Sequence, residues 1–283
     1  MNYRHAYHAG NHADVLKHAV LARLVQYLAL KDKPFCVLDA HAGLGVYDLA
    51  AEQAAKTGEW QGGIGLMQAD FAPEVEAILA PYRQALARLN TDGGTRFYPG
   101  SPEIILGEMR SSDRLLANEL HADDFETLKL NYGSDKRLRP LLGDAGNAVK
   151  AQLPFKERRG LVLIDPPYEE RDETERVARM LANGAKRMPA GILMIWYPVT
   201  TEAFVDTFMS AMIGQRIGNI LRAELRIKNT HEASGLSGSG LLIFNPPFTL
   251  YTELEVLLPA LASRLGVDGL GRSHLTWLTP PKK

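Results

Sequence analysis

The stretch that most constrains the fold is residues 159–168. Its first half, at 160–164, is a short run of apolar and mostly branched side chains, which is typical of a strand buried on both faces of a parallel sheet. Pro166 and Pro167 then end that strand, because they have no N–H to donate, and Pro166 pushes Asp165 towards an extended conformation. Open α/β sheets bind ligands at the carboxyl ends of their strands. The sequence therefore predicts a stiff corner there, from which a carboxylate, a carbonyl and an aromatic ring project together.

This set of groups suits methyl transfer to the exocyclic amine of adenine. The lone pair of that amine is delocalised into the ring, so the nitrogen must pyramidalise before it attacks an electrophilic methyl group. Two acceptors aimed at its N–H bonds favour that change. We expect Asp165 and the Pro166 carbonyl to supply them, while Tyr168 stacks on the base. From this motif alone, the alternative of a strand that simply ends in a Pro-Pro turn stays open.

A glycine turn follows the first predicted strand of the chain. Residues 35–39 form another buried apolar run, and the Gly-Leu-Gly at 43–45 follows it, where glycines let the backbone approach a ligand closely. The third glycine of the dinucleotide fingerprint is absent, and no phosphate-binding loop follows. With Asp39, however, the turn resembles the nucleoside-binding turn of S-adenosylmethionine-dependent methyltransferases. Residues 165–168 match the Asp-Pro-Pro-Tyr signature of those that methylate amino groups.

Two acidic residues compete for the ribose of such a cofactor. In these sheets the carboxylate that binds the ribose hydroxyls follows the second strand. Asp70 lies near the usual distance from the glycine turn but follows a glycine-heavy run, whereas Glu119 ends the better strand at 114–118, so we prefer Glu119. That choice makes residues from about 47 to 97, which are Ala-rich and have helical spacing, an inserted helical subdomain.

The later predicted strands supply two further candidates. A strand at 138–142 ends near Asp144, which either binds the adenine ring of the cofactor or caps the next helix, and the two interpretations have equal weight. Asn245 precedes a second Pro-Pro pair and is a rival for Asp165. Its strand at 240–244 comes late in the chain, where this fold closes with an antiparallel hairpin, so we prefer Asp165.

Other strands are expected at 192–198, 217–227 and 275–278, and helices at 121–132, 171–188, 201–214 and 249–265.

Composition excludes several classes of protein. With 46% hydrophobic and 23% charged residues the chain is typical of a globular protein, and its net charge of −1 gives no global attraction for nucleic acid. Basic clusters at 136–139 and 156–159 are local candidates for such contacts, against the alternative of solvated faces. The single cysteine, Cys36, rules out an intrachain disulfide. No signal peptide or long apolar run is present, so we expect a cytoplasmic protein without a membrane span.

The N-terminal residues 1–12 are aromatic, basic and rich in histidine, and we expect them to form an ordered arm. A helix with Asn11 as its predicted N-cap follows, and residues 31–34 end it. Four histidines invite a metal hypothesis, namely His5, His8, His12 and His18. Their spacing does not place an i, i+4 pair on one helix face, and no cysteine accompanies them, so we expect no metal.

Taken together, these residues closely resemble the bacterial large-subunit ribosomal RNA methyltransferase J family, which methylates N6 of adenine in 23S rRNA. The resemblance runs nearly end to end, and its most specific part is the arm motif at 3–18. It implies a Rossmann-like class I fold, with a seven-stranded and mostly parallel α/β sheet. The whole chain, residues 1–283, then forms one methyltransferase domain with an N-terminal arm at 1–12 and the inserted helical subdomain at about 47–97.

The resemblance also implies roles for particular residues. It makes Asp165 the catalytic residue, beside the Pro166 and Tyr168 that the chemistry above selects. S-adenosyl-L-methionine is the implied cofactor, and the residues expected to line its site are His18, His41, Gly43, Ser101, Glu119, Asp144, Ala145 and Asp165. Tyr3 and Lys17, together with Tyr168, are expected to face the substrate.

We therefore expect a monomeric enzyme that uses S-adenosylmethionine and binds 23S rRNA. Two alternatives stay open. The first keeps the enzyme but changes the substrate to adenine in DNA or to a protein amide, although amide enzymes typically have Asn where this chain has Asp165. The second is a nucleic-acid-binding factor without catalysis that is involved in the use of external DNA, a role also described for the family.

Overall fold

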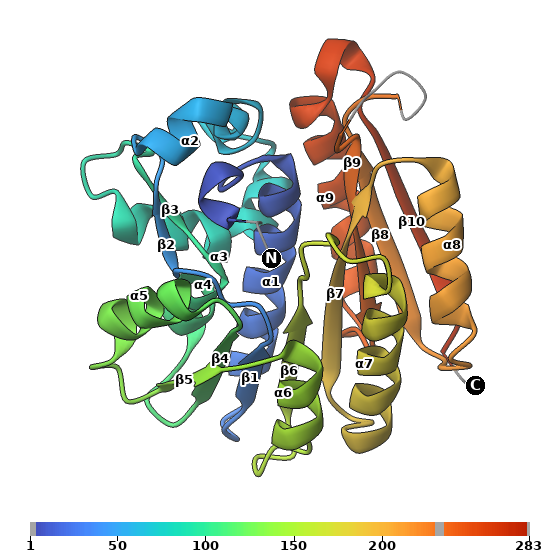
Figure 1. Cartoon of the computed structure of the whole chain (residues 1–283). Helices are drawn as coiled ribbons and strands as arrows, with labels where there is room; N and C mark the ends of the chain where they lie inside the picture. Colours follow the sequence, from blue (N-terminus) through green and yellow to red (C-terminus); the bar gives the residue numbers. More distant parts are fainter. Residues whose placement is uncertain (1–3, 230–234, 282–283) are drawn as a thin grey trace.

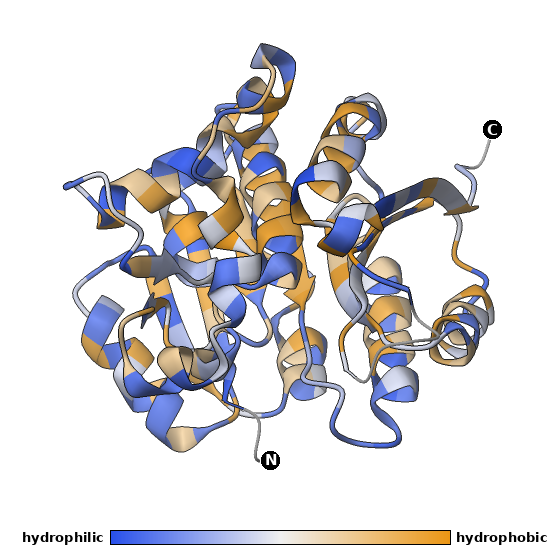
Figure 2. Cartoon of the chain, turned by 90° about the horizontal axis from the view of Figure 1, so that it is seen from above, coloured by the Kyte–Doolittle hydropathy of each residue, from blue (hydrophilic) through white to orange (hydrophobic). Residues whose placement is uncertain are grey.

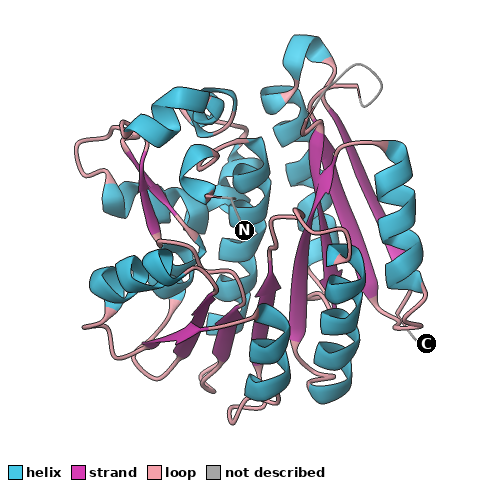
Figure 3. Cartoon of the chain, in the orientation of Figure 1, coloured by secondary structure: helices cyan, strands magenta, loops and turns pink. Residues whose placement is uncertain are grey.

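The computed structural model describes residues 4–229 and 235–281. The strands of its main sheet are β1 (Cys36–Asp39), β4 (Arg114–Glu119), β5 (Leu138–Leu142), β6 (Gly160–Ile164), β7 (Ile192–Val199), β8 (Ile220–Arg226), β9 (Gly238–Phe244) and β10 (Arg272–Thr279). Their spatial order is β10-β8-β9-β7-β6-β1-β4-β5 (Figures 1 and 3). The neighbours from β7 to β5 are parallel, whereas β9 is antiparallel to β7 and β8, and β10 is antiparallel to β8. The predicted Rossmann-like class of fold is confirmed.

Among the described residues the sheet has eight strands, one more than the seven that the family resemblance implied. The additional edge strand is β10, whose residues Arg272 to Thr279 pair with β8. The sequence suggested only a short apolar strand at 275–278 because the first three residues of β10 are polar and exposed. Hydrophobic periodicity underestimates such a strand, since an edge strand need be apolar only where another element covers it.

Helices cover both faces of the sheet and create two hydrophobic cores. On one face lie α1 (His12–Ala29), α3 (Pro73–Leu89), α4 (Ser101–Glu108), α5 (Ala122–Tyr132) and α9 (Leu250–Leu265). On the other lie α6 (Ala145–Gln152), α7 (Glu173–Arg187) and α8 (Glu202–Ile213). Strand residues alternate between the two cores, so that Val37 of β1 enters the first and Leu38 the second. Figure 2 shows hydrophobic residues concentrated on the sheet and on the helix faces beside it.

The segment between β1 and β4 also contains several short elements. They are β2 (Val46–Asp48), α2 (Glu52–Thr57), the 3-10 helices η2 (Glu59–Gly62) and η3 (Ile64–Met67), and β3 (Phe97–Pro99). β2 and β3 pair antiparallel in a separate two-stranded sheet that the sequence did not predict. Leu79 and Tyr82 of α3 belong to the same hydrophobic core as α1. The helical character of the segment agrees with its sequence, and its treatment as a subdomain stays a prediction.

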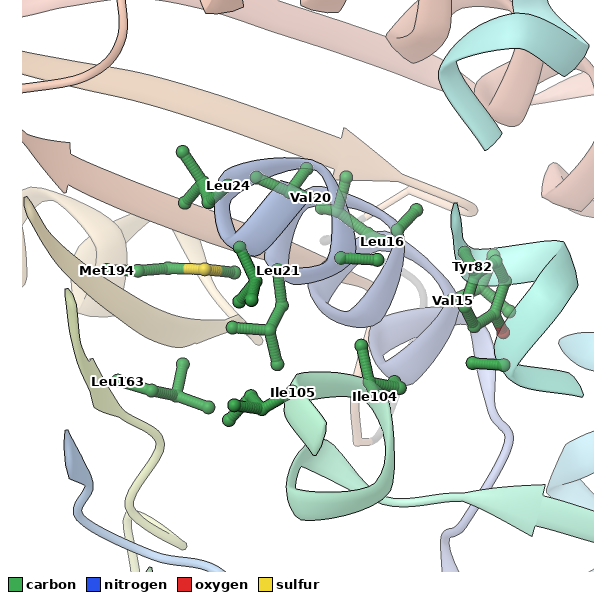
Figure 4. Close-up of a cluster of buried hydrophobic side chains, with 14 of the residues drawn as sticks. Val15, Leu16, Val20, Leu21, Leu24, Tyr82, Ile104, Ile105, Leu163 and Met194 are labelled. Atoms are coloured by element: carbon green, nitrogen blue, oxygen red, sulfur yellow. The ribbon is translucent and has the colours of Figure 1, made fainter. Parts of the chain in front are cut away.

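Helix α1 lies at the centre of the first core. The Asn11 side chain caps it by accepting hydrogen bonds from the backbone N–H groups of Ala13 and Asp14, both at 3.0 Å. Figure 4 shows the residues that pack here, which are Leu16, Val20, Leu21 and Leu24 of α1, Tyr82 of α3, Ile104 and Ile105 of α4, Leu163 of β6 and Met194 of β7. Because α1 is buried on most sides, its polar residues are held at fixed positions relative to β6.

We expect Leu21→Ala to lower the free energy of unfolding by about 2–5 kcal/mol, because it removes a fully buried side chain and leaves a cavity. Urea unfolding followed by circular dichroism measures the change. Leu30→Ala is the matched control, since Leu30 follows the same helix but is 75% exposed, and here we expect at most about 0.5 kcal/mol. Equal effects of the two substitutions would contradict the packing described for α1.

Candidate active site

A cavity of about 730 Å³ lies at the carboxyl ends of the parallel strands, between them and the N-terminal part of α1. Its volume is within the range of roughly 300–1,000 Å³ that small-molecule and cofactor sites occupy. The predicted site residues that line it are Lys17, His18, His41, Gly43, Ser101, Glu119, Asp144, Ala145, Asp165, Pro166 and Tyr168. Tyr3 lies outside the described residues. The structure therefore brings together, at one edge of the sheet, residues that are far apart in the sequence.

A lysine from the first helix holds the carboxylate of Asp165. Lys17 Nζ forms an ion pair with Asp165 Oδ2 and a second one, at 2.9 Å, with Asp14 Oδ1. The side chains of Asp14 and Lys17 are 2% and 5% exposed, whereas that of Asp165 is 17% exposed. Burial disfavours the ammonium, but the two carboxylates outweigh burial and raise the pKa of Lys17 above its ordinary value. Lys17 is therefore cationic, and Asp165 is the most accessible member of this cluster.

His41 lies beside Asp165 as a neutral imidazole. Its Nδ1 accepts a hydrogen bond from the backbone N–H of Asp165 at 3.1 Å, so the proton of the neutral ring is on Nε2. Burial lowers the pKa of His41 to about 4. Asp39, at the end of β1, accepts a hydrogen bond from the backbone N–H of His41 at 3.3 Å, and burial raises the pKa of Asp39 to about 7. His41 is thus fixed as a hydrogen-bond donor through Nε2.

His18 contacts the buried Tyr98, which in turn contacts the buried Tyr82. The Tyr98 hydroxyl lies 2.9 Å from His18 Nδ1 and 3.1 Å from the Tyr82 hydroxyl. Burial lowers the pKa of His18 well below its ordinary value, so this imidazole is also neutral. The resemblance selected His18, but it did not identify Tyr82 and Tyr98. The chain of contacts from His18 through Tyr98 to Tyr82 depends on the packing of α3 and β3 against α1, which no local sequence pattern reveals.

A hydrogen bond joins the glycine turn to Glu119. Glu119 Oε2 accepts a hydrogen bond from the backbone N–H of Gly43 at 2.9 Å, and Oε1 accepts one from that of His121 at 2.8 Å. Gly43 has a φ of +61°, and a Cβ atom there would lie 2.3 Å from the Tyr47 hydroxyl oxygen. A side chain at this position would therefore be strained and would collide with a neighbour. The carboxylate of Glu119 is pre-oriented at the wall of the cavity.

Asp144 acts as a helix cap in this structure. Its Oδ1 accepts a hydrogen bond from the backbone N–H of Asn147 at 2.9 Å, which is the cap of α6. Its Oδ2 accepts a hydrogen bond from the Arg176 guanidinium of α7 at 2.6 Å. The structure thus shows the capping interpretation directly, whereas a contact of Asp144 with the cofactor stays a prediction. Arg176 lines the cavity and was missed in the sequence analysis.

Tyr168 is fixed in orientation by its backbone and its hydroxyl group. Its φ of +54° is unusual for a residue other than glycine and costs of order 1–3 kcal/mol. The hydroxyl donates a hydrogen bond to the Trp196 carbonyl at 2.8 Å. The ring makes edge-on contacts with those of Trp196, Phe204 and Phe208. A strained residue that is held in this way at a cavity wall is typical of a functional site.

The rival motif at Asn245 lies at the other edge of the sheet. Asn245 Nδ2 donates a hydrogen bond to the carbonyl of Gly191, which precedes β7, and its Oδ1 accepts one from Asn219. Because β9 is antiparallel to β7, its carboxyl end points away from Asp165. Asp70, the rival of Glu119, does not line the cavity, and its backbone carbonyl accepts a hydrogen bond from Arg264.

The cavity is acidic. Among the described residues that line it, the acidic ones are Asp14, Glu59, Glu119, Asp124, Asp144, Asp165, Glu169, Glu170, Asp172 and Glu173. Apart from histidines, the basic residues in the same lining are Lys17 and Arg176. Such a surface attracts a cationic ligand and repels phosphate groups.

The two basic clusters chosen from the sequence do not lie at this cavity. Arg159 precedes β6, at the edge of the sheet opposite to Asp165, and its guanidinium donates hydrogen bonds to the carbonyls of Leu28 and Lys33. Arg137 binds the carbonyls of Leu106 and Met109. These arginines therefore satisfy backbone groups inside the fold, which the sequence pattern cannot distinguish from contacts with nucleic acid.

His5 and His8 contact different carboxylates. His5 Nε2 lies 2.9 Å from Asp14 Oδ2, and His8 Nδ1 lies 2.9 Å from Glu59 Oε1. No group of three or more potential metal-binding side chains is found within residues 4–229 and 235–281. Over the same residues, no helix combines the length and apolar character that crossing a membrane requires.

We expect His41→Asn to make the protein less sensitive to acid. The unfolded chain takes up a proton on this imidazole near the ordinary pKa of about 6.5, whereas the folded one stays neutral down to about pH 4. The stability associated with the neutral ring is therefore lost as the pH falls from about 6.5 to about 4. Asparagine still accepts from the Asp165 N–H. Urea unfolding at pH 7 and pH 5 should show a loss of stability about 1–2 kcal/mol smaller than in the wild type.

His8→Asn is the control for this prediction, and its effect on the loss of stability in acid should have the opposite sign. The hydrogen bond with Glu59 raises the pKa of His8, so His8 contributes stability that is present in acid and is lost as the pH rises. His8→Asn should therefore be more sensitive to acid than the wild type. A His41→Asn variant with unchanged pH dependence would contradict the neutral state assigned to His41.

Comparison with known proteins places the chain in a family. Residues 32–279 match the family described as "Ribosomal RNA large subunit methyltransferase D, RlmJ". The ribosomal RNA large subunit methyltransferase J of Haemophilus influenzae is 40% identical over 283 residues, and that of Escherichia coli is 39% identical over 282 residues, in each case across 99% of both chains. The crystal structure of a Legionella pneumophila protein with 32% identity matches with a TM-score of 0.88 over 95% of this chain and 98% of that one. The chain therefore belongs to the family of large-subunit ribosomal RNA methyltransferases, in agreement with the methyltransferase class and the S-adenosylmethionine cofactor expected from its motifs.

Proposed function

We propose that this protein transfers the methyl group of S-adenosylmethionine to N6 of an adenine in 23S rRNA. The observation that carries the proposal is that Asp165, at the end of β6, shares one cavity of about 730 Å³ with the glycine turn and Glu119. The names of the two relatives supply the large-subunit RNA as the substrate. We keep the monomeric state and the cytoplasmic location as predictions.

The residues present fit the cofactor. Glu119 offers two carboxylate oxygens, each already oriented by one backbone N–H, and its place at the end of β4 suits the ribose hydroxyls. Ala145 and Asp144 lie after β5, where the adenine ring of such a cofactor binds. His18, His41 and Ser101 are then left for the methionine end, together with Gly43. The acidic lining suits a ligand that carries an ammonium and a sulfonium.

The methyl-transfer centre is built around Asp165. Bound S-adenosylmethionine supplies a methyl group on a cationic sulfur, which becomes neutral when the methyl group leaves. Lys17 occupies Oδ2 of Asp165, and Oδ1 accepts no hydrogen bond from the described residues, so Oδ1 is available to the adenine amine. The Pro166 carbonyl is the second acceptor. Together they orient the nitrogen lone pair towards the methyl group, and the amine proton is lost to solvent after the new C–N bond forms.

The target adenine has to leave its stack to reach this centre. RNA enzymes of this kind act on unpaired or extruded bases, which they bind by stacking and by hydrogen bonds to the base edge. Tyr168 and Trp196 form an aromatic wall of the cavity. The acidic lining repels phosphates, so we expect the base to enter while its backbone stays at the mouth.

We expect Asp165→Ala to lower kcat by at least about 100-fold and to leave the affinity for S-adenosylmethionine within about tenfold, because Asp165 acts on the amine in the transition state. Transfer of a labelled methyl group to rRNA from a methylation-deficient strain measures kcat, and calorimetry measures the affinity. Glu175→Ala is the matched control, since Glu175 is an exposed carboxylate of α7 that is not part of the cavity lining, and it should retain normal kcat.

The same assay separates the alternatives. Duplex DNA and protein are offered to the wild-type enzyme beside the rRNA, and the products are digested to identify the methylated nucleoside or amide. N6-methyladenosine in the rRNA digest supports the proposal. Methylation of DNA alone, or no methylation by a protein that binds both the cofactor and RNA, would replace it with one of the two alternatives. Near-normal turnover by Asp165→Ala would contradict the role of Asp165.

A further inference from the structure

Asp14 is a buried carboxylate in the first turn of α1. Its Oδ2 accepts a hydrogen bond from the backbone N–H of Gly10 and lies 2.9 Å from His5 Nε2. Its Oδ1 lies 2.9 Å from Lys17 Nζ and 3.9 Å from His18 Nε2. Asp14 therefore joins the N-terminal arm, the first turn of α1 and the lysine that holds Asp165.

Lys17 is shared between two carboxylates that do not touch each other directly. Asp14 approaches it from the same helix, three positions earlier, and Asp165 approaches it from the end of β6. The side chains of Asp14 and Lys17 are almost completely buried, so water has little access to the ion pair between these two residues. In such surroundings an ammonium that loses one of two carboxylates binds the other more tightly, because the same charge is then neutralised by a single partner.

We propose that Asp14 is a positioning residue, which holds part of the charge of Lys17 so that the Asp165 carboxylate stays available to the adenine amine. The inference rests on the proposed function of Asp165. Without the negative charge of Asp14, Lys17 turns wholly towards Asp165. It then competes with the amine for the carboxylate, and the amine is held less accurately in front of the methyl group.

The net charge of these three side chains supports the same assignment. Asp14, Lys17 and Asp165 together carry a net charge of −1 when all three are ionised. That excess negative charge lies beside a cavity that receives a cationic donor. Neutralising Asp14 removes the excess and leaves a neutral Lys17–Asp165 pair. The donor and the amine then both meet a weaker acceptor at the place where positive charge develops during transfer.

The test compares two substitutions whose order separates charge from packing. Asp14→Asn keeps the size of the side chain and an oxygen for the Gly10 N–H but removes the charge, whereas Asp14→Glu keeps the charge and adds a methylene to a packed site. If Asp14 positions Lys17 through its charge, Asp14→Asn should lower kcat by about 10-fold to 100-fold at saturating cofactor and rRNA. Asp14→Glu should then keep a clearly higher kcat than Asp14→Asn. A purely structural role predicts the reverse order, because the larger side chain disturbs the packing more.

A matched control removes a buried carboxylate elsewhere. Asp113 is also almost fully buried, pairs with Arg110 and accepts from the Phe35 N–H at the opposite edge of the sheet. Asp113→Asn should lower the melting temperature, because it weakens a buried ion pair. It should leave kcat within about threefold, because Asp113 lies at the opposite edge of the sheet from the cavity. The affinity for S-adenosylmethionine, measured by calorimetry, should change less than kcat does in Asp14→Asn.

The outcomes are distinct. A normal kcat in Asp14→Asn, or an Asp14→Glu variant no better than Asp14→Asn, overturns the positioning role while the wild-type rate still supports the proposed function. A wild-type protein that does not methylate adenine in rRNA overturns the proposed function, and the inference falls with it. Loss of kcat in Asp14→Asn with retention in Asp14→Glu and Asp113→Asn supports both.

Discussion

The burial of helix α1 against the sheet is the constraint on which the site depends. Leu21 and Leu24 face the same core as Leu163 of β6, and this packing sets the distance between the helix and the carboxyl end of that strand. Lys17 is one turn before Leu21, so it reaches Asp165 only because the helix is held at this depth. The ion pair is a consequence of apolar packing, and the packing positions a charged residue where water has little access.

The electrostatics of the cavity follow from the same arrangement. Parallel strands end at one edge, so the carboxylates at or just after the ends of β4, β5 and β6 gather there, while helix α1 adds Asp14 and a single lysine. Burial keeps His18 and His41 neutral, which leaves the acids largely uncompensated. A cationic methyl donor fits such a site. Neither basic cluster identified in the sequence lies at this cavity, and one arginine of each, Arg137 and Arg159, binds backbone carbonyls.

Much of the fold and of the cavity lining could be predicted because their signals are local. A strand that stops at two prolines, a glycine turn after a strand and an acid at a strand end each depend on a few neighbouring residues. The small sheet of β2 and β3 was missed because its two short strands are far apart in the sequence. Asp14 was missed although its spacing from Lys17 and His18 matches one helix face, since the same spacing occurs in many exposed helices. Arg176 was missed because its contact with Asp144 depends on how α7 lies against α6.

The most direct test of the account is the structure of the protein with S-adenosylhomocysteine and an adenosine nucleotide bound together. We predict that the adenine amine lies about 3 Å from both an Asp165 carboxylate oxygen and the Pro166 carbonyl, with the sulfur of the cofactor product facing the same nitrogen. Lys17 should then still contact Asp14. An adenine bound elsewhere, with Asp165 engaged by Lys17 alone and no purine in the space beside Tyr168, would contradict the central claim.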